Sequence, residues 1–395
     1  MRLEDFVDGQ ALEALYRPMD EARGLPASVY TEAFHRLENR YLFPRTWGAV
    51  AVGSQIPNEG DVLPVMLGDW PVLLVRGLGS EIKAYLNICR HRGMRLVTGL
   101  KRRCEAIKCP WHSWTYDLEG KLISAPNYSG WAKDGIRELE AKKIELRKLP
   151  VAVWRDLIFV NIDGNAPPFE DHCKPIEALL REYRLDDLRY GGIREHVYEG
   201  NWKVSMEGAI EGYHTPWGHP QACDGVTGWK EQIRTHETCY AATDSWFTFG
   251  GENSDASSVF GSGLPSLAKF YTNGESRILL GNIFPTEIFV ACLDHFLHVL
   301  LLPDGWNRTR LMFHFYYGGE AAQGGALKAT RQSIEDQWLT IAGQDDDFVA
   351  YVQANMLVRD QAGIAPQFAP YWEGAAHHFQ KMVVETIQKE QSANI

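Results

Sequence analysis

The chain has 395 residues, of which 45% are hydrophobic and 12% aromatic, a composition typical of folded domains. Its formal net charge of −11 disfavours binding to nucleic acid or to anionic membranes, because both attract cations. The N-terminal stretch MRLEDFVDGQ has early acids and no continuous apolar run, and no apolar stretch is long enough to span a bilayer. We therefore expect a cytoplasmic protein, in which clustered cysteines indicate metal or redox chemistry rather than disulfides.

The predicted elements change character twice along the chain. Residues 28–42 follow Pro26, carry apolar residues at helical spacing and predict a helix. From about Trp47 to Val160, short β-rich runs separated by Gly, Pro, Asn and Asp predict a small antiparallel β domain. One hairpin turn is expected at Glu119-Gly120.

Beyond Pro167-Pro168 the pattern is mixed. Residues 174–184 and 200–215 predict helices, residues 278–318 predict antiparallel strands, and the remainder is mostly helical in pattern. The chain is thus expected to be α+β, with a β domain at 47–160 inserted between an N-terminal helical part (1–46) and the remainder (161–395) of a larger domain.

Two Cys-His pairs lie within the predicted β domain, Cys89-x-His91 and Cys109-x2-His112. Two thiolates and two imidazoles suit a tetrahedral zinc site. They also suit a Rieske [2Fe–2S] cluster, in which two Cys bind one iron and two His bind the other. The mixed pairing favours the cluster, because each pair offers one ligand to each iron. Cys104 lies between the pairs and fits neither.

The stretch CRHRG followed by CPWHSWTYDLEG resembles the Rieske domain of the Rieske non-heme iron oxygenases, in their terminal oxygenase α subunits. One departure is Ser113, where the family usually has Gly. The resemblance implies that Cys89 and Cys109 bind one iron of a [2Fe–2S] cluster, with His91 and His112 facing outward on the other. It also implies a second domain with a START-like fold of helices and an antiparallel sheet, which holds a mononuclear Fe(II).

A second His pair lies in NWKVSMEGAIEGYHTPWGHP, where His214 and His219 are five residues apart. On an unbroken helix these side chains diverge, but Pro216 and Gly218 should distort the helix and let both imidazoles converge. By itself this spacing is weak evidence of a metal site. Asn-Trp-Lys followed by Glu-x2-His-x4-His resembles the family's iron-binding helix, and the resemblance implies His214 and His219 as ligands.

The third iron ligand is expected in GQDDDFVAYVQ, because oxygen-activating Fe(II) takes two His and one carboxylate. The helix dipole also explains acids at a helix start, so the acids alone do not select a ligand. The family pattern has an Asp three residues before an aliphatic residue and seven before a Gln. With Val349 and Gln353 this selects Asp346, and Asp345 is the alternative.

The resemblance implies a terminal oxygenase that uses O2 and electrons from NAD(P)H, delivered by a separate reductase with or without a ferredoxin. It further implies a head-to-tail homotrimer in which Glu211 bridges a Rieske His of one subunit to an iron His of the next. Whether a β subunit is also present stays open. The sequence Trp217-Gly-His219 favours a small aromatic substrate, which would be mono- or dihydroxylated.

Several alternatives stay open. An N- or O-demethylating or quaternary-amine monooxygenase of the same family has the same ligands. An aromatic cage for a quaternary ammonium and a slot for an arene would use the same kinds of residue, here Trp229, Tyr240, Trp246, Phe247 and Phe249. Two alternatives belong to other classes of protein: a Rieske electron carrier without catalysis and a zinc-stabilised binding protein.

Overall fold

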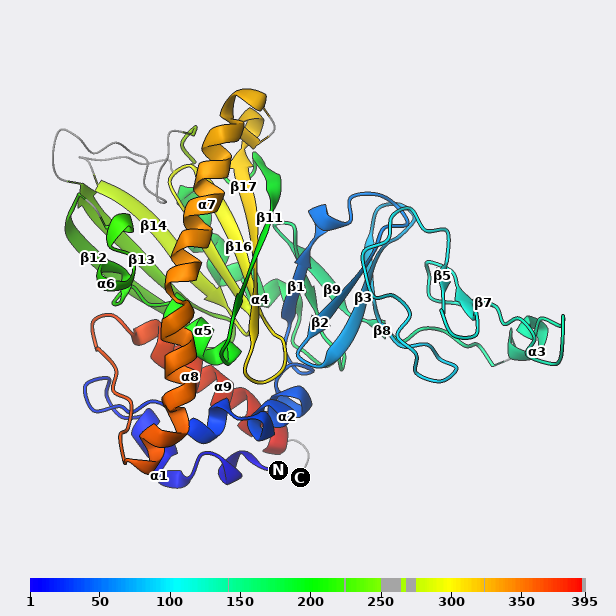
Figure 1. Ribbon diagram of the computed structural model, residues 1–395, viewed down its shortest axis with the longest axis horizontal. Helices are drawn as coiled ribbons and strands as arrows, with labels where there is room; N and C mark the ends of the chain where they lie inside the picture. The colour runs from blue at the N-terminus through cyan, green and yellow to red at the C-terminus, as the bar shows by residue number, and fades with distance from the viewer. Residues whose placement is uncertain (141, 224, 250–263, 268–274, 323, 393–395) are drawn as a thin grey trace. The chain divides into compact units, whose positions relative to one another are not determined.

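Figure 1 shows a computed structural model of the chain, and the structure describes residues 1–140, 142–223, 225–249, 264–267, 275–322 and 324–392. Contacts divide the chain into two compact units, one made of Met1–Leu42 with Pro167–Ile395 and the other of Phe43–Ala166. The second unit interrupts the first in sequence. The borders predicted from the sequence were 46/47 and 160/161. Within the described residues, no helix has the length and apolarity needed to cross a membrane.

The inserted unit consists of short antiparallel strands in three small sheets, with orders β1-β10-β9, β2-β3-β4-β8 and β5-β6-β7. These strands are β1 (Gly48–Val52), β2 (Val62–Leu67), β3 (Trp70–Arg76), β4 (Ile82–Leu86), β5 (Ile107–Lys108), β6 (Thr115–Tyr116), β7 (Leu122–Ser124), β8 (Lys148–Leu149), β9 (Val151–Trp154) and β10 (Leu157–Val160). A short helix, α3 (Ile136–Glu140), lies between β7 and β8. The expected antiparallel β domain is confirmed, and the Glu119-Gly120 turn joins β6 to β7.

The first unit is built on a seven-stranded antiparallel sheet of order β11-β17-β16-β15-β14-β13-β12. Its strands are β11 (Leu188–Tyr198), β12 (Val226–His236), β13 (Tyr240–Phe249), β14 (Glu275–Ile283), β15 (Glu287–Ala291), β16 (His295–Pro303) and β17 (Thr309–Gly318). The strands expected over 278–318 are present as β14 to β17. The sequence did not predict β11, β12 and β13, whose polar residues obscure the alternation typical of a strand.

The first unit also contains α-helices. They are α1 (Gly9–Leu15), α2 (Glu32–Tyr41), α4 (Phe169–Leu179), α5 (Trp202–Ala209), α6 (Thr215–Gly218), α7 (Lys328–Gln344), α8 (Asp346–Gln361) and α9 (Gly374–Ser392). In Figure 1 the long helix α7 runs across the sheet, with α8 continuing from its end. α7 contacts β11, α9 contacts β12 and β13, and α5 contacts β16. The expected α+β class, a helical layer on an antiparallel sheet, is confirmed.

The triplet Asn201-Trp202-Lys203 starts α5 and ties it to distant parts of the unit. The Asn201 side chain accepts a hydrogen bond from the Lys203 N–H (3.0 Å), which caps the helix. Its amide donates to the Trp306 carbonyl (2.6 Å), in the turn between β16 and β17. Its backbone N–H donates to Gln353 Oε1 of α8 (2.9 Å). The start of α5 is therefore held from three directions.

Lys203 forms a buried ion pair with Glu38 of α2. The side chains are 1% and 0% exposed, and Lys203 Nζ lies 2.5 Å from Glu38 Oε1. Trp202 Nε1 donates to the other carboxylate oxygen (3.2 Å), and the ammonium lies 5.1 Å from the Phe34 ring centroid. Burial raises the pKa of the Glu38 carboxyl, but Lys203 and the surrounding hydrogen bonds bring it below its usual range. The pair connects segments that precede and follow the inserted unit.

We expect Lys203→Met to lower the free energy of unfolding by about 3–5 kcal/mol, because it leaves the Glu38 carboxylate buried and unpaired. Adding Glu38→Met should restore much of the loss. The control is Arg36→Met, which removes an exposed ion pair with Glu32 on the same helix and should change stability little. Urea unfolding followed by tryptophan fluorescence measures all three. Equal stability of the Lys203 and Arg36 variants would contradict the role of the buried pair.

Candidate metal centres

The two Cys-His pairs of the inserted unit lie on loops with the same backbone hydrogen bonds. In each loop the Cys N–H donates to the carbonyl five residues later, and the N–H four residues later donates back to the Cys carbonyl. The four bonds are Cys89 to Met94 (2.8 Å), Gly93 to Cys89 (3.0 Å), Cys109 to Trp114 (2.8 Å) and Ser113 to Cys109 (3.1 Å). Each cysteine therefore opens the same turn, although the spacing to its histidine differs.

Gly93 and Ser113 occupy equivalent positions in these turns. Both have positive φ, +77° and +58° respectively, in the left-handed region that favours glycine. The departure at Ser113 thus falls at a position where the backbone itself explains the usual glycine. Serine has a small side chain, and Ser113 adopts this conformation within an intact loop.

Burial separates the two kinds of ligand. Cys89 and Cys109 are each 2% exposed, whereas His91 and His112 are exposed. The two imidazole centroids lie 4.6 Å apart, and His91 stacks on Trp114 at 4.8 Å. The four predicted residues are therefore brought together, with the thiols inside and the imidazoles at the surface.

Tyr116 adds a polar contact beneath the loops. Its hydroxyl lies 3.4 Å from Cys89 Sγ and accepts a hydrogen bond from the Arg90 N–H (3.0 Å). Burial raises the pKa of the Cys89 thiol and the Tyr116 contact lowers it, with a net rise. Hydrogen bonds to cysteine sulfur tune the potential of an iron–sulfur cluster. The donor set, its asymmetric burial and this contact fit a Rieske [2Fe–2S] cluster.

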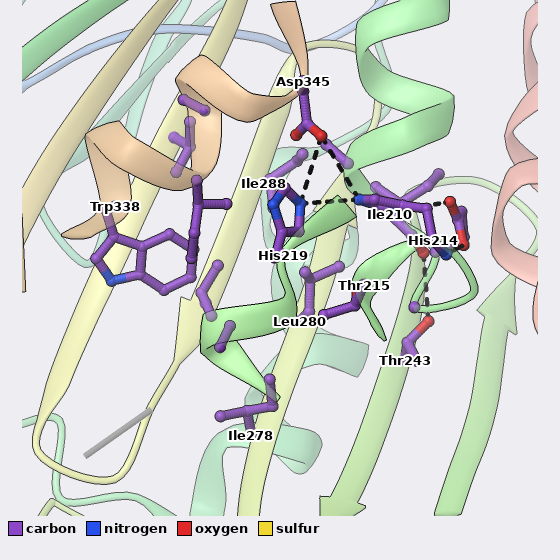
Figure 2. A pocket seen from close by; sticks show the side chains of 18 of the residues that line it. Ile210, His214, Thr215, His219, Thr243, Ile278, Leu280, Ile288, Trp338 and Asp345 are labelled. Atoms are coloured by element: carbon purple, nitrogen blue, oxygen red, sulfur yellow. Dashed lines mark hydrogen bonds and ion pairs between the residues drawn. The ribbon is translucent and has the colours of Figure 1, made fainter. Parts of the chain in front are cut away.

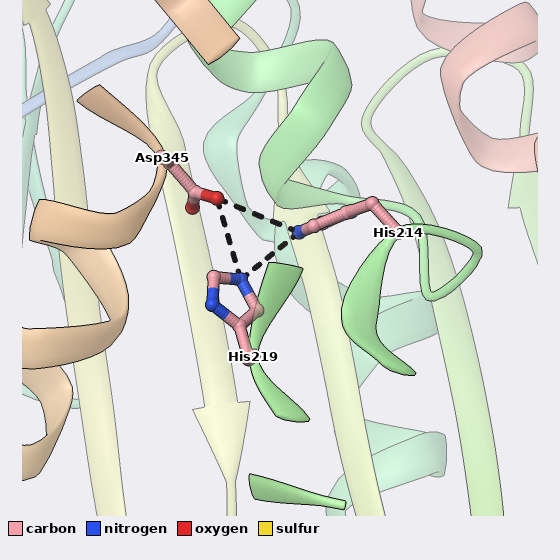
Figure 3. Close-up of side chains that lie close together, drawn as sticks. All are labelled: His214, His219 and Asp345. Atoms are coloured by element: carbon pink, nitrogen blue, oxygen red, sulfur yellow. Dashed lines mark hydrogen bonds and ion pairs between the residues drawn. The ribbon is translucent and has the colours of Figure 1, made fainter. Parts of the chain in front are cut away.

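His214, His219 and Asp345 meet in the first unit, as Figure 3 shows. Their candidate ligand atoms lie within 4.8 Å of one another. The two His Nε2 atoms are 3.1 Å apart, and Asp345 Oδ1 lies 3.3 Å from His219 Nε2 and 3.9 Å from His214 Nε2. Asp345 Oδ1 is buried and accepts no hydrogen bond from the described residues. Two imidazoles and a carboxylate fit a mononuclear non-heme iron.

The partners of the other ring nitrogens set the tautomers. His214 Nδ1 donates to Glu211 Oε1, and His219 Nδ1 donates to Gln344 Oε1 (2.9 Å). In both rings Nε2 is then free to bind a metal, which is the usual arrangement of a ligating histidine. Glu211 was expected from the sequence, whereas Gln344 was not, because nothing in its local pattern distinguishes it.

The choice of Asp346 as third ligand is contradicted by this geometry, which brings the alternative, Asp345, to the histidines. Asp346 Oδ1 instead lies 2.7 Å from His196 Nε2 of β11. Asp345 is the single residue between α7 and α8. Successive residues near a helix terminus point about 100° apart, so only one of the two neighbours can face His214 and His219. The spacing to Val349 and Gln353 was one residue off.

Burial and neighbouring charges shift the pKa values of Asp345 and His214 in this group. Burial raises the pKa of Asp345, while His219 and His214 partly offset this effect. Burial also lowers the pKa of His214, but the Glu211 carboxylate outweighs it and brings a net rise. The carboxylates of Asp345 and Glu211 therefore attract positive charge to the point where the ring nitrogens converge.

A break after α5 makes this convergence possible. The helix ends at Ala209, rather than near Pro216 as the sequence indicated, and Glu211 and His214 lie in the following turn. Pro216 lies in the first turn of the short helix α6 instead of ending α5, because proline is well tolerated in a first helical turn. The expected distortion between the two histidines is present, but it begins earlier.

A cavity of about 130 Å³ opens beside the histidines. Its walls come from the turn after α5, the sheet face and α7, and they are mostly aliphatic, with Ile278, Leu280 and Ile288 on the sheet and Trp338 on α7 (Figure 2). An apolar cavity with a few convergent polar groups is typical of a small-molecule site.

The aromatic residues considered from the sequence contribute little to this cavity. Trp229 lines it, whereas Tyr240, Trp246 and Phe247 are not among its lining residues. The side chain of Phe249 lies outside the described residues. Glu231 lines the cavity as well, and sequence reasoning missed it because a single Glu in a polar strand carries no signal.

We expect Asp345→Ala to lose the mononuclear iron while the [2Fe–2S] cluster stays, because the carboxylate that faces the two histidines is removed. The matched control, Asp346→Ala, removes the neighbouring carboxylate and should keep both metals. Iron content per chain, read together with the visible absorbance of the cluster, distinguishes the variants. Iron loss in the Asp346 variant alone would restore the original choice.

Comparison with known proteins agrees with both centres. A family model described as "Ring hydroxylating alpha subunit (catalytic domain)" matches residues 185–389, and one described as "Rieske [2Fe-2S] domain" matches residues 46–150. A glycine betaine monooxygenase oxygenase subunit from Chromohalobacter salexigens is 30% identical over 236 residues, covering 56% of this chain and 52% of that protein. A biphenyl dioxygenase subunit alpha from Metapseudomonas furukawaii is 31% identical over 207 residues, covering 49% and 44%.

The chain thus aligns with about half the length of these curated relatives. A crystal structure of a quaternary ammonium Rieske monooxygenase with an inhibitor has a TM-score of 0.75 at 20% identity, covering 98% of each chain, and so has the same fold. The two family matches together span most of the sequence. The chain belongs to the family of Rieske non-heme iron oxygenase α subunits.

Proposed function

We propose that this chain is the terminal oxygenase of a multicomponent system that oxidises a small quaternary ammonium or N-methylated amine. Electrons come from NAD(P)H through a separate reductase, with or without a ferredoxin. The observation that carries the proposal is the convergence of His214, His219 and Asp345 at the wall of an apolar cavity, in a chain that also holds a Rieske domain. A Rieske electron carrier without catalysis does not require that cavity. A zinc-stabilised binding protein does not require both the Cys-His set and the His-His-Asp set.

The ammonium class is supported by the relatives and by the charge of the cavity. A glycine betaine monooxygenase and a carnitine monooxygenase subunit are each 30% identical to aligned parts of this chain. Among the described lining residues, Glu211, Glu231 and Asp345 are acidic and none is Lys or Arg. The sequence favoured an aromatic substrate, but this charge balance and these relatives favour its alternative. Biphenyl dioxygenase relatives and the aliphatic walls keep arene oxidation as the second candidate.

In the proposed reaction, one oxygen atom of O2 enters a C–H bond of an N-methyl group. The other leaves as water, with two electrons and one proton from NAD(P)H and a second proton from solvent, and the hydroxymethyl amine then releases formaldehyde. Iron, when bound by His214, His219 and Asp345, supplies the activation of O2. Glu211 and Gln344 hold the two imidazoles in the required tautomer, and the aliphatic walls exclude water from the reacting carbon.

Electron delivery is proposed to run between neighbouring subunits of a homotrimer, through Glu211. Its Oε1 accepts from His214 Nδ1, which provides the half of the bridge that lies within this chain. Exposed aromatic residues flank the site on the turn, on α6 and on α8: Tyr213 is 49% exposed, Trp217 82% and Phe348 50%. An exposed aromatic group of this kind suits a protein contact, and a neighbouring Rieske domain would cover it.

The substrate proposal is tested with the iron-loaded protein and a surrogate reductase. NADH-dependent O2 uptake is measured with choline, glycine betaine and carnitine, and in parallel with biphenyl and naphthalene. We expect uptake with at least one ammonium compound, accompanied by formaldehyde if an N-methyl group is attacked. Uptake coupled to a hydroxylated arene alone would transfer the assignment to the second candidate.

We expect Glu211→Gln to leave both metals bound and to lower turnover about 10- to 100-fold, because an amide cannot hold two imidazole N–H groups as a carboxylate does. Glu195→Gln is the matched control, since Glu195 is exposed on β11 and pairs only with Arg310 among the described contacts. Reduction of the cluster, its reoxidation by O2 and substrate, and metal content are followed separately. Normal reoxidation in a fully loaded Glu211 variant would contradict the bridging role.

A further inference from the structure

One carboxylate of the cavity is not engaged by a histidine. Glu211 holds His214, and Asp345 faces both imidazoles. The third, Glu231, lies on β12 opposite Ser245 of β13 and lines the same cavity. It therefore has no role in holding the iron ligands.

The two oxygens of Glu231 have different surroundings. Oε1 accepts hydrogen bonds from Trp229 Nε1 (3.1 Å) and the Ser245 hydroxyl (3.4 Å). Oε2 is buried and has no hydrogen-bond partner among the described residues. A buried carboxylate oxygen without a donor is costly, so an unpartnered Oε2 on a residue that lines the cavity indicates a missing positive partner. Burial raises the pKa of Glu231 to about 7, which is the expected state of such a group without its cation.

Gly212 places this carboxylate beside the iron ligands. A Cβ at Gly212 would lie 2.1 Å from Glu231 Oε1 and 3.6 Å from the Trp229 ring. The carboxylate and the indole therefore press against the backbone between Glu211 and His214. A ligand that contacts Glu231 lies next to the histidines, within the same cavity.

Trp229 is held in position for a second contact. Its ring lies 5.4 Å from that of Phe247 and 6.3 Å from that of Trp372, measured between centroids. Its N–H donates a hydrogen bond to Glu231. The side chains of residues 229 and 231 lie on the same side of β12, because side chains two residues apart on a strand share a face. A carboxylate next to an indole provides both electrostatic and cation–π attraction for an ammonium ion.

We propose that Glu231 and Trp229 form the subsite for the positively charged nitrogen of the substrate, with Glu231 as the residue that selects a cation over a neutral isostere. This inference rests on the proposed ammonium substrate and extends it to a named subsite. It assigns no part in the chemistry of O2 to either residue.

The test uses the iron-loaded protein and two probes of the same shape, choline and its uncharged analogue 3,3-dimethylbutan-1-ol. Binding of each is measured by calorimetry. We expect the wild type to bind choline at least about 10-fold more tightly than the alcohol. Glu231→Gln should weaken choline binding about 10- to 100-fold, leave the alcohol unchanged, and so remove the preference.

Two control variants separate a binding role from a structural one. Glu231→Asp keeps the charge and should retain a preference for choline. Glu237→Gln removes an exposed carboxylate in the turn after β12 and should match the wild type. A wild type without a preference for choline would overturn the subsite without any variant, so the proposal stays falsifiable if Glu231→Gln fails to fold.

The outcomes distinguish the two proposals. Equal losses for choline and the alcohol in Glu231→Gln, or no loss for either, would overturn the subsite while ammonium oxidation by the wild type still stands. A wild type that binds both probes equally would overturn it as well. A wild type that binds neither and takes up O2 only with arenes would overturn both the substrate class and the subsite.

Discussion

The buried ion pair between Glu38 and Lys203 is the constraint on which the catalytic unit depends. One charge precedes the inserted unit in sequence and the other follows it, so pairing them closes the first unit across the insertion. Burial of either charge without the other is costly, so the pair strongly favours one position of α5 relative to α2. Asn201 connects the same helix end to Gln353 of α8. The segments that carry the two histidines and Asp345 are thereby fixed to one anchor.

In both candidate centres, some of the ligand residues are held by a polar partner. Tyr116 contacts the sulfur of Cys89, while Glu211 and Gln344 occupy the Nδ1 atoms of the two histidines. Two carboxylate oxygens on residues that line the cavity, Asp345 Oδ1 and Glu231 Oε2, are buried without a hydrogen bond among the described residues. Asp345 Oδ1 lies beside the Nε2 atoms of both histidines, as a metal ligand would. Glu231 forms no ion pair with a histidine among the described residues, and it is the carboxylate that we propose binds the substrate cation.

Sequence patterns predicted the strands of the large sheet that are apolar and failed on those that are rich in polar residues. The strands β14 to β17 have buried, apolar residues and were expected. On β12 and β13 the cavity-facing positions include Glu231, Thr243 and Ser245, so the usual hydrophobic alternation is absent. The end of α5 was also missed, although the turn that follows it is local, since the Tyr213 and His214 N–H groups donate to the Glu211 carboxylate.

The sequence by itself determined what is local. Each Cys-His pair, and Glu211 with the two histidines, lies within a few residues, so short turns bring the groups together whatever the remainder of the chain does. Only the tertiary structure decided what depends on distant segments. It selected Asp345 over Asp346, because a one-residue step at the junction of α7 and α8 rotates the carboxylate away from the histidines. It also placed Glu231 against Gly212, a contact between a strand and a turn that no spacing along the chain encodes.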